Sequence, residues 1–250
     1  KNGESFTVKQ LLDALLVHSA NDAAFVLARY VGGGNIQKFI DLMNSEAKKI
    51  GATNTHFNNP HGLPDPNHYT TAHDMALIAR EAMNNDTFRQ IVKTKSLKFE
   101  ATKAYPYERY FVNTNKFLTS HDKITYKGQP INIKYDIVDG IKTGYTGNAG
   151  YCLSFSMVVN KNDKNEKKRR VIGVVLGTNH KNKRTSASLA LLKYGKENFN
   201  MKKVIDKDSF IGKKYIKGMK ELEVTLKAKD ELYTILKDDE SIKSDRKSVV

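Results

Sequence analysis

One stretch of the chain carries residue types that suit chemistry on a peptide. Residues 139–146 place a cation, a hydroxyl and a residue without a side chain next to one another, at Lys142, Thr143 and Gly144. The run from 151 to 159 that follows alternates between apolar and polar residues, as a strand does. A glycine in such a strand allows another backbone to approach closely and pair with it. The stretch therefore predicts the wall of a cleft that binds an extended peptide beside a positive charge.

A second polar motif, Ser19-Ala20-Asn21, interrupts a helical pattern near the start of the chain. In a continuous helix the side chains of Ser19 and Asn21 would diverge by about 200°. In a turn, both side chains can face the same cleft, which would give the site a second wall. The alternative is that Ser19 or Asp22 only caps the helix that follows.

Helical periodicity dominates the part of the chain around this motif. Apolar residues recur with helical spacing in several runs, and Thr7, Asn35 and Thr71, which precede three of them, are good helix caps. The loop from 52 to 70 contains His61 and three prolines, and its length exceeds that of most connections, which indicates a functional loop. The predicted helices span residues 7–17, 23–31, 36–50, 71–83 and 88–93.

After the last of these helices the period of the pattern shortens to about two residues, which predicts β-structure. Residues 151–159 and 171–178 are predicted to form an antiparallel hairpin joined by a charged loop, and a helix from 184 to 199 follows them. Further strands are predicted at 97–101, 105–112 and 131–137. This half of the chain must therefore supply the sheet that carries Lys142.

The composition is that of a soluble globular protein. The 250 residues are 39% hydrophobic and 28% charged, and no apolar run approaches the roughly 20 residues that a membrane span requires. The formal net charge of +15 predicts an anionic partner, such as nucleic acid, a lipid surface or an acidic cell-wall polymer, although a general abundance of Lys and Asn explains it as well. The basic residues form no stripe with interleaved aromatics, which argues against nucleic acid.

The single cysteine, Cys152, excludes an internal disulfide and a Cys-based metal site.

The order of these pieces resembles the penicillin-binding proteins, and in particular the low-molecular-mass serine D-alanyl-D-alanine carboxypeptidases. The resemblance implies an α/β (α+β) fold of the β-lactamase/D,D-peptidase type, in which helices flank an antiparallel sheet. It assigns residues 1–199 to the peptidase domain and 200–250 to the start of a small β-rich domain, which we expect to be cut off before it closes. The segments that carry the resemblance are 18–24, 54–57, 61–63, 69–76 and 138–146.

The resemblance implies roles for three catalytic residues. Ser19 would relay a proton to the leaving D-alanine, and Asn21 would hydrogen-bond the substrate peptide and fix the active-site lysine. Lys142 would supply the positive charge that orients Ser19 and the substrate carboxylate.

It also implies a set of substrate-binding residues. Thr143 would donate its hydroxyl to the substrate carboxylate, Thr146 would add a second hydroxyl, and the backbone N–H of Tyr145 would be one oxyanion donor. Arg184 would grip the terminal carboxylate, and His61 would lie in a loop near the cleft. The complete set is Thr143, Gly144, Tyr145, Thr146, His61 and Arg184.

The nucleophile of this family is the serine of a Ser-x-x-Lys motif that precedes Ser-x-Asn. Only eighteen residues stand before Ser19 here, and the chain's own matches, which start at Ser45 and Ser120, both follow it. We therefore expect the nucleophile and its lysine, together with at least one strand of the sheet, to lie in an upstream segment. The chain by itself is predicted to be inactive.

The resemblance implies removal of the terminal D-alanine from peptidoglycan pentapeptide stems through an acyl-enzyme, inhibited by β-lactam antibiotics and without a metal or organic cofactor. It implies an extracytoplasmic location at the cell envelope, membrane-surface association through a C-terminal region beyond this chain, and no nucleic-acid partner. One alternative is a β-lactamase of the same fold, which requires a general base; the loop from 52 to 70 offers Asp65 but no Glu. The other is a non-catalytic relative that binds the cell wall.

Overall fold

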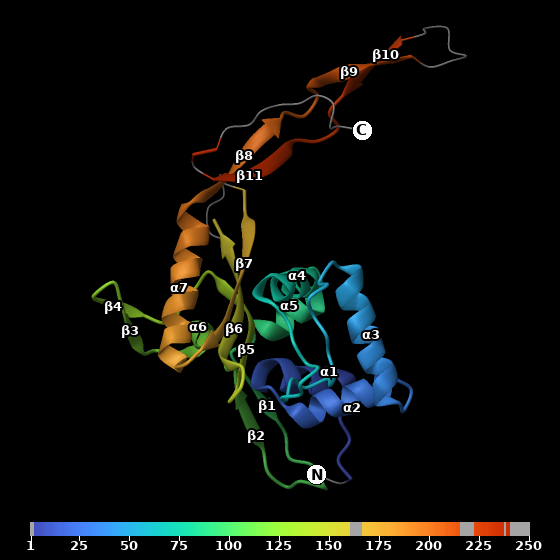
Figure 1. The fold of residues 1–250 in the computed structure, drawn as a ribbon, viewed down its shortest axis with the longest axis vertical. Coiled ribbons are helices and arrows are strands. Elements are labelled where there is room, and N and C mark those ends of the chain that lie inside the picture. Colours follow the sequence, from blue (N-terminus) through green and yellow to red (C-terminus); the bar gives the residue numbers. More distant parts are fainter. Residues whose placement is uncertain (1–2, 161–166, 216–222, 238, 241–250) are drawn as a thin grey trace.

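The computed structural model describes residues 3–160, 167–215, 223–237 and 239–240 (Figure 1). Helices and an antiparallel sheet form a body, and two-stranded ribbons extend from one end of it. Within the described residues, no helix combines the length and the apolar character that crossing a bilayer demands. The predicted antiparallel sheet flanked by helices is present.

Three helices of the first half begin where the sequence predicts caps, because side-chain oxygens there accept otherwise free backbone N–H groups. Thr7 forms a capping box with Gln10, and Asn35 and Thr71 cap two later helices. The five helices predicted in this part are therefore confirmed. They are α1 (Val8–Asp13), α2 (Asn21–Val31), α3 (Ile36–Lys49), α4 (Ala72–Ala82) and α5 (Asp86–Val92).

The turn at the Ser-x-Asn motif follows a widening of the first helix. α1 continues into a π-helical turn, η1 (Ala14–His18), and Ser19 then adopts a left-handed conformation with φ 70° and ψ 41°. The Ser19 N–H donates to the carbonyl of Leu15 at 2.9 Å, which holds this conformation. Ala20 is the N-cap residue of α2, so Ser19 does not cap this helix. Asn21 and Asp22 already belong to its first turn, where the Asp22 carboxylate accepts the Ala23 N–H at 2.9 Å.

Three antiparallel strands form the central sheet in the order β5, β6, β7. They are β5 (Val138–Thr146), β6 (Gly150–Val159) and β7 (Arg169–Thr178). The helix α7 (Lys181–Glu197) lies on one side of the sheet, and α4 and α5 lie on the other (Figure 1). The predicted hairpin of β6 and β7 and the predicted strand at Lys142 are confirmed. In the described residues β5 and β7 are the edges of this sheet, and an edge strand can accept a further strand.

The core lies between the sheet and α7. Phe155 of β6 is completely buried against Leu189 and Leu192 of α7. Gly173 on β7 makes this packing possible, because a Cβ there would lie 2.1 Å from the Phe155 ring. On the other face, Ile141 of β5 packs against α4 and α5. Each such side chain contributes roughly 1.5–3 kcal/mol through burial, so the sheet that carries Lys142 is well anchored.

Two small ribbons lie between α5 and β5 in the chain. The sequence analysis missed α6 and β3, and its strand at 131–137 is wrong beyond Asn132. The backbone N–H groups of Ile133 and Tyr135 donate to carbonyls in and just after α6, each at 3.0 Å, instead of to a neighbouring strand. The elements here are β1 (Ser96–Phe99), β2 (Arg109–Val112), α6 (Lys116–Thr119), β3 (Lys123–Tyr126) and β4 (Gln129–Asn132), with β1 paired to β2 and β3 to β4.

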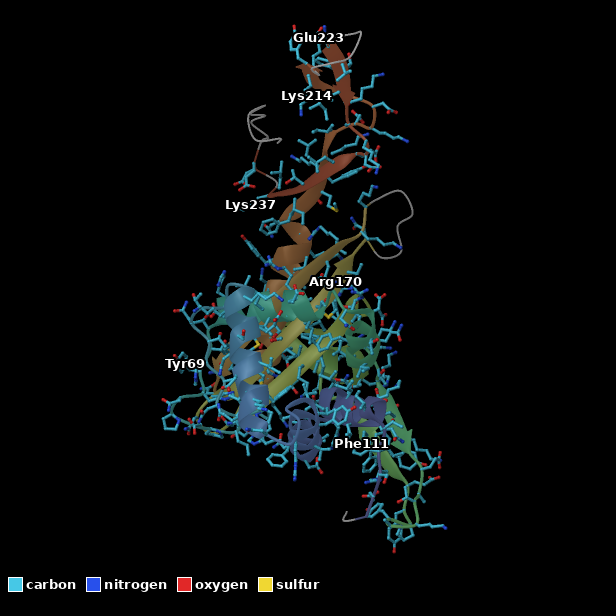
Figure 2. The ribbon with its side chains drawn as sticks, turned by 90° about the vertical axis from the view of Figure 1, so that its right-hand side faces the viewer. Tyr69, Phe111, Arg170, Lys214, Glu223 and Lys237 are labelled. Carbon is cyan, nitrogen blue, oxygen red and sulfur yellow. The ribbon has the colours of Figure 1, made fainter. Side chains whose placement is uncertain are left out.

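The remaining strands form an arm that extends away from the sheet (Figure 1). β8 (Phe199–Ile205) pairs with β11 (Leu232–Lys237), and β9 (Phe210–Tyr215) pairs with β10 (Glu223–Lys227). Figure 2 shows Lys214, Glu223 and Lys237 along this arm. The β-structure expected after residue 200 is thus present, although α7 ends at Glu197 and not at 199. A domain boundary between 199 and 200 stays a prediction, and residues 241–250 lie outside the described ones.

Candidate active site

The two motifs singled out in the sequence are joined through one residue, Thr114. The Thr143 hydroxyl donates to the Thr114 hydroxyl at 2.6 Å. The Thr114 backbone N–H donates to the carbonyl of Val17, two residues before Ser19, at 3.3 Å. The strand that carries Lys142 is therefore tied to the turn that carries Ser19.

Two buried asparagines hold Thr114 in place. Asn113 and Asn115 are 4% and 0% exposed. The Asn113 amide donates to two carbonyls at the end of α5, at 3.1 and 2.9 Å, and the Asn115 amide donates to the carbonyl of Gly140 in β5 at 2.9 Å. Leaving such a buried group unpaired costs roughly 1–3 kcal/mol, so these bonds fix the loop. The sequence analysis missed all three residues, although an Asn just before the apolar pair of α6 is a helix-start signal.

Two cations lie near Thr143. The Lys142 ammonium donates to the carbonyl of Thr143 at 2.9 Å, and burial, followed by the nearby charge of Arg184, lowers the pKa of Lys142 to about 8. Arg184 of α7 is 8% exposed, burial lowers the pKa of its guanidinium, and its Nε has no hydrogen-bond partner among the described residues. In the described part of the chain, no carboxylate pairs with either group. Secluded positive charges without a counter-ion favour the binding of an anion.

Aromatic rings flank these charges. Tyr145 lies opposite Tyr151 in the ladder of β5 and β6, and their ring centroids are 4.2 Å apart. The guanidinium carbon of Arg184 lies 6.0 Å from the Tyr151 ring centroid. Tyr145 is 60% exposed. Tyr151 thus connects the end of β5 to the helix that supplies Arg184.

Gly144 and Thr146 are also predicted site residues on β5, and their structural roles differ. A Cβ at Gly144 would meet only the Cβ of Cys152, at an ordinary contact distance of 3.8 Å, so packing within the described chain does not require glycine here. Because β5 is an edge strand, the missing side chain instead leaves room for another backbone. The Thr146 hydroxyl accepts a hydrogen bond from Ala149 N at 3.0 Å and so stabilises the turn between β5 and β6.

An ion pair holds β5 from the opposite edge of the sheet. Arg170 of β7 reaches across β6 to both carboxylate oxygens of Asp139 at 2.9 Å and also contacts the Ser156 hydroxyl. Figure 2 shows Arg170 at the end of the sheet from which the arm extends. The first residue of the 139–146 stretch therefore has a structural role, which the sequence analysis left unassigned.

The Ser19 turn is much less enclosed. Ser19 and Asn21 are exposed, and neither side chain has a recorded hydrogen bond among the described residues. The ring of His18 packs against that of Phe111, with the ring centroids 5.0 Å apart. Figure 2 labels Phe111 beside the N-terminal helices. The structure thus brings the backbone of this turn to the Lys142 strand through Thr114, but it records no contact of the Ser19 side chain with Lys142.

The hydrogen bonds of His61 lie within its own loop. Its ring Nδ1 accepts a hydrogen bond from Leu63 N at 3.3 Å, and its backbone N–H donates to Asn59 Oδ1 at 3.2 Å. The same loop is anchored on α4, where the carboxylate of Asp74, 1% exposed, accepts bonds from Asn54 N and the Thr55 hydroxyl at 2.7 and 2.9 Å. No recorded contact in the described residues joins His61 to the Lys142 cluster.

Neither Ser-x-x-Lys match of the chain contacts this cluster in the described residues. Ser45 is exposed on α3, and the Ser120 hydroxyl accepts a bond from Asp122 N at 3.1 Å in the turn after α6. The described residues also bring no three His, Cys, Asp or Glu side chains together as a metal site requires. Within the described residues the arrangement suits an anion, because two cations there have no carboxylate partner.

The protein has the β-lactamase-like fold of the penicillin-binding proteins. Its features are an antiparallel sheet flanked by helices, Lys-Thr-Gly on an edge strand, and a Ser-x-Asn turn joined to that strand through Thr114. Penicillin binding protein 5 from Haemophilus influenzae is 29% identical, with a TM-score of 0.72 over 94% of this chain and 61% of that one. The D-alanyl-D-alanine carboxypeptidase DacD from Francisella tularensis is 31% identical, with a TM-score of 0.67 over 95% of this chain and 64% of that one. The predicted fold class is confirmed.

The chain belongs to the peptidase family S11, the D-alanyl-D-alanine carboxypeptidases, whose profile matches residues 1–180. D-alanyl-D-alanine carboxypeptidase DacF of Bacillus subtilis is 28% identical over 99% of this chain and 57% of its own length. DacD of Escherichia coli is 30% identical over 85% of this chain and 48% of its own length. The chain thus spans about half the length of the curated relatives it matches, and the family predicted from the sequence is confirmed.

Proposed function

We propose that the protein is a serine-type D-alanyl-D-alanine carboxypeptidase that removes the terminal D-alanine from peptidoglycan pentapeptide stems. The observation that carries this proposal is a pair of cations, half-buried Lys142 and buried Arg184, that have no carboxylate partner in the described residues. Lys142 is bonded to the carbonyl of Thr143 on the edge strand β5. A substrate that ends in a carboxylate and lies in an extended form matches both features. Membership of the family supplies the reaction type.

In this proposal the substrate backbone pairs with the edge of β5 beside Gly144. Its terminal carboxylate accepts a hydrogen bond from the Thr143 hydroxyl and faces Lys142 and Arg184. The carboxylate thereby supplies the counter-ion that these cations lack in the described residues. Asn21 hydrogen-bonds the stem peptide, and the Tyr145 N–H is one donor to the oxyanion. Thr146 borders the same groove. His61 stays a predicted substrate-binding residue, and its hydrogen bonds in the structure lie within its own loop.

The proposed reaction proceeds in two steps, acylation and hydrolysis. The nucleophilic serine oxygen attacks the carbonyl carbon of the penultimate D-alanine, and the bond from that carbon to the nitrogen of the terminal D-alanine breaks. Ser19 relays the proton of the attacking hydroxyl to the departing amine, oriented by the charge of Lys142. Water then hydrolyses the ester, which releases the shortened peptide and restores the serine hydroxyl.

We further infer that the nucleophile belongs to a Ser-x-x-Lys motif outside these 250 residues, so that the chain by itself is inactive. The positions of Ser45 and Ser120, neither of which contacts the Lys142 cluster, support this inference. So does the share of the curated relatives that the chain spans, which is 57% and 48% of their lengths. The open edge of β7 offers a place for a further strand.

The proposal includes the partners and the location of the protein. β-Lactam antibiotics would acylate the same serine, and the enzyme would act outside the cytoplasmic membrane, with membrane-surface association through a region beyond this chain. The formal net charge of +15 fits an anionic wall or membrane surface better than nucleic acid. Binding to purified wall that did not weaken as salt increases would contradict this use of the charge.

The test is intact-mass spectrometry after exposure to benzylpenicillin, on this chain and on the full-length protein that contains it. We expect a one-to-one adduct on the full-length protein alone, mapped to the serine of a Ser-x-x-Lys motif before residue 1. An adduct on this chain would refute the external nucleophile. No adduct on either form would refute acylation and leave a non-catalytic relative, whereas rapid release of hydrolysed penicillin would indicate a β-lactamase.

A further inference from the structure

Thr114 is the residue that contacts both walls of the candidate site. Its hydroxyl accepts the Thr143 hydroxyl at 2.6 Å, and its backbone N–H donates to Val17 O in the turn before Ser19 at 3.3 Å. The neighbours Asn113 and Asn115 are buried and bonded to α5 and β5, so the loop cannot shift without breaking these bonds. We infer that Thr114 is a positioning residue for the substrate carboxylate, an inference that rests on the proposed function.

The hydroxyl of Thr114 is suited to this task because a hydroxyl both donates and accepts. In the structure Thr143 donates its proton to Thr114, which fixes the rotamer of Thr143 on the strand. No acceptor for the proton of Thr114 itself is recorded among the described residues. When a carboxylate binds, Thr143 turns its proton to that anion and Thr114 donates to the freed lone pair of Thr143. No covalent bond changes, and the second hydrogen bond strengthens the first.

The surrounding charge gives this pair its importance. Lys142 donates to the carbonyl of Thr143 at 2.9 Å, so cation, carbonyl and hydroxyl of adjacent residues are all fixed in one place. A Thr143 hydroxyl that is free to rotate would occupy the orientation that faces the carboxylate for only part of the time. Thr114 therefore acts on affinity for the carboxylate and not on the chemical step, because it does not reach the carbonyl under attack.

The experiment compares Thr114→Val, which keeps the shape but removes the hydroxyl, with Thr114→Ser, which keeps the hydroxyl. Both are made in the full-length protein. Two substrates are used: an N-acyl thioester whose leaving group carries a carboxylate, and the methyl ester of that same substrate. We expect Thr114→Val to raise KM about fivefold to tenfold for the carboxylate substrate, with kcat nearly unchanged, and to leave the methyl ester unaffected. Thr114→Ser should restore the wild-type KM.

Each other result has a distinct meaning. If Thr114→Val matches the wild type on the carboxylate substrate, the inference is wrong while the proposed function stands. Equal losses on both substrates, with a lower melting temperature, would mean that Thr114 only supports the fold, which also overturns the inference. If the wild-type protein acts on neither substrate, the proposed function fails and the inference fails with it.

Discussion

Lys142 and Ser19 stand on two walls of one candidate site, and the structure holds these walls in very different ways. The Lys142 wall belongs to a strand in a continuous ladder with β6, crossed by the Arg170–Asp139 ion pair and packed through Ile141. Ser19 is an exposed, left-handed residue at a helix junction. Its turn reaches the strand through the loop that Thr114 occupies.

The two walls differ in the way that their proposed roles require. A group that stabilises charge must be preorganised, because reorienting dipoles or cations at the moment of reaction would raise the barrier. The wall that we propose binds the carboxylate is already in place, and its cations have no carboxylate partner among the described residues. On the wall proposed to relay the proton, Ser19 and Asn21 are exposed.

Removing the cation of the rigid wall should have the largest effect. We expect Lys142→Ala to slow acylation of the full-length protein by benzylpenicillin about 100-fold or more, because a preorganised charge at the reacting group is lost. Time-resolved intact-mass measurements give the rate. Lys183→Ala, on the exposed first turn of the same helix as Arg184, is the control and should match the wild type. A near-normal rate for Lys142→Ala would remove this residue from the mechanism.

Loosening the loop between the walls should reduce stability. Asn115→Ala removes the buried bond to Gly140 O and the cap bond that Phe117 N donates to Asn115. We expect the free energy of unfolding to fall by about 2–4 kcal/mol, since one buried carbonyl is left unpaired. Urea unfolding of this chain measures the change, and the exposed Asn84→Ala is the matched control. A loss below about 0.5 kcal/mol would show that the loop does not depend on this bond.

Carboxylate binding should weaken as the pH rises. Burial and then the charge of Arg184 lower the pKa of Lys142 to about 8, so the ammonium is charged below that pH and becomes neutral above it. We expect KM for a carboxylate substrate to rise between about pH 7 and 9.5, by up to tenfold per unit above the pKa.

The matched test of this pH dependence is Arg184→Gln. Without the neighbouring positive charge, the pKa of Lys142 should increase, and the rise of KM should begin at a higher pH. The variant will also bind the carboxylate less tightly at every pH. A profile whose midpoint stays where it was would mean that Arg184 does not act on Lys142.

The smallest predicted effect is a gain in stability at the Ser19 turn, where Ser19 has φ 70°. Glycine adopts this conformation without strain, so we expect Ser19→Gly to stabilise this chain by about 0.5 kcal/mol in urea unfolding. The same change should abolish proton relay in the full-length protein. Ser19→Ala is the control, because it also lacks the hydroxyl but keeps the strain. If Ser19→Gly is less stable than Ser19→Ala, the turn is not strained.

The sequence predicted those parts of the molecule that depend on local rules. Thr7, Asn35 and Thr71 cap helices because a side-chain oxygen meets an N–H two or three residues away, and such spacing is visible in the sequence. The alternating patterns at 151–159 and 171–178 likewise predicted the hairpin of β6 and β7.

Other features depend on distant partners and were out of reach. The strand predicted through Ile133 fails because its backbone bonds to the α6 region. Thr114 is unremarkable in sequence, since its role comes from Val17 and Thr143, which lie far from it along the chain. Arg184 was placed near the site by family resemblance, but its seclusion and unpaired Nε are visible only in three dimensions.

The spare room at Gly144 has a consequence for how variants of this protein should be screened. A Cβ added there would meet one atom at 3.8 Å, and the residue's φ is not in the left-handed region. Alanine at this position should therefore pass every assay of folding, expression or melting temperature. The same methyl group would stand where the proposed peptide partner needs to lie. A survey that ranks substitutions by thermal shift would score Gly144→Ala as harmless and overlook a variant that has lost its substrate.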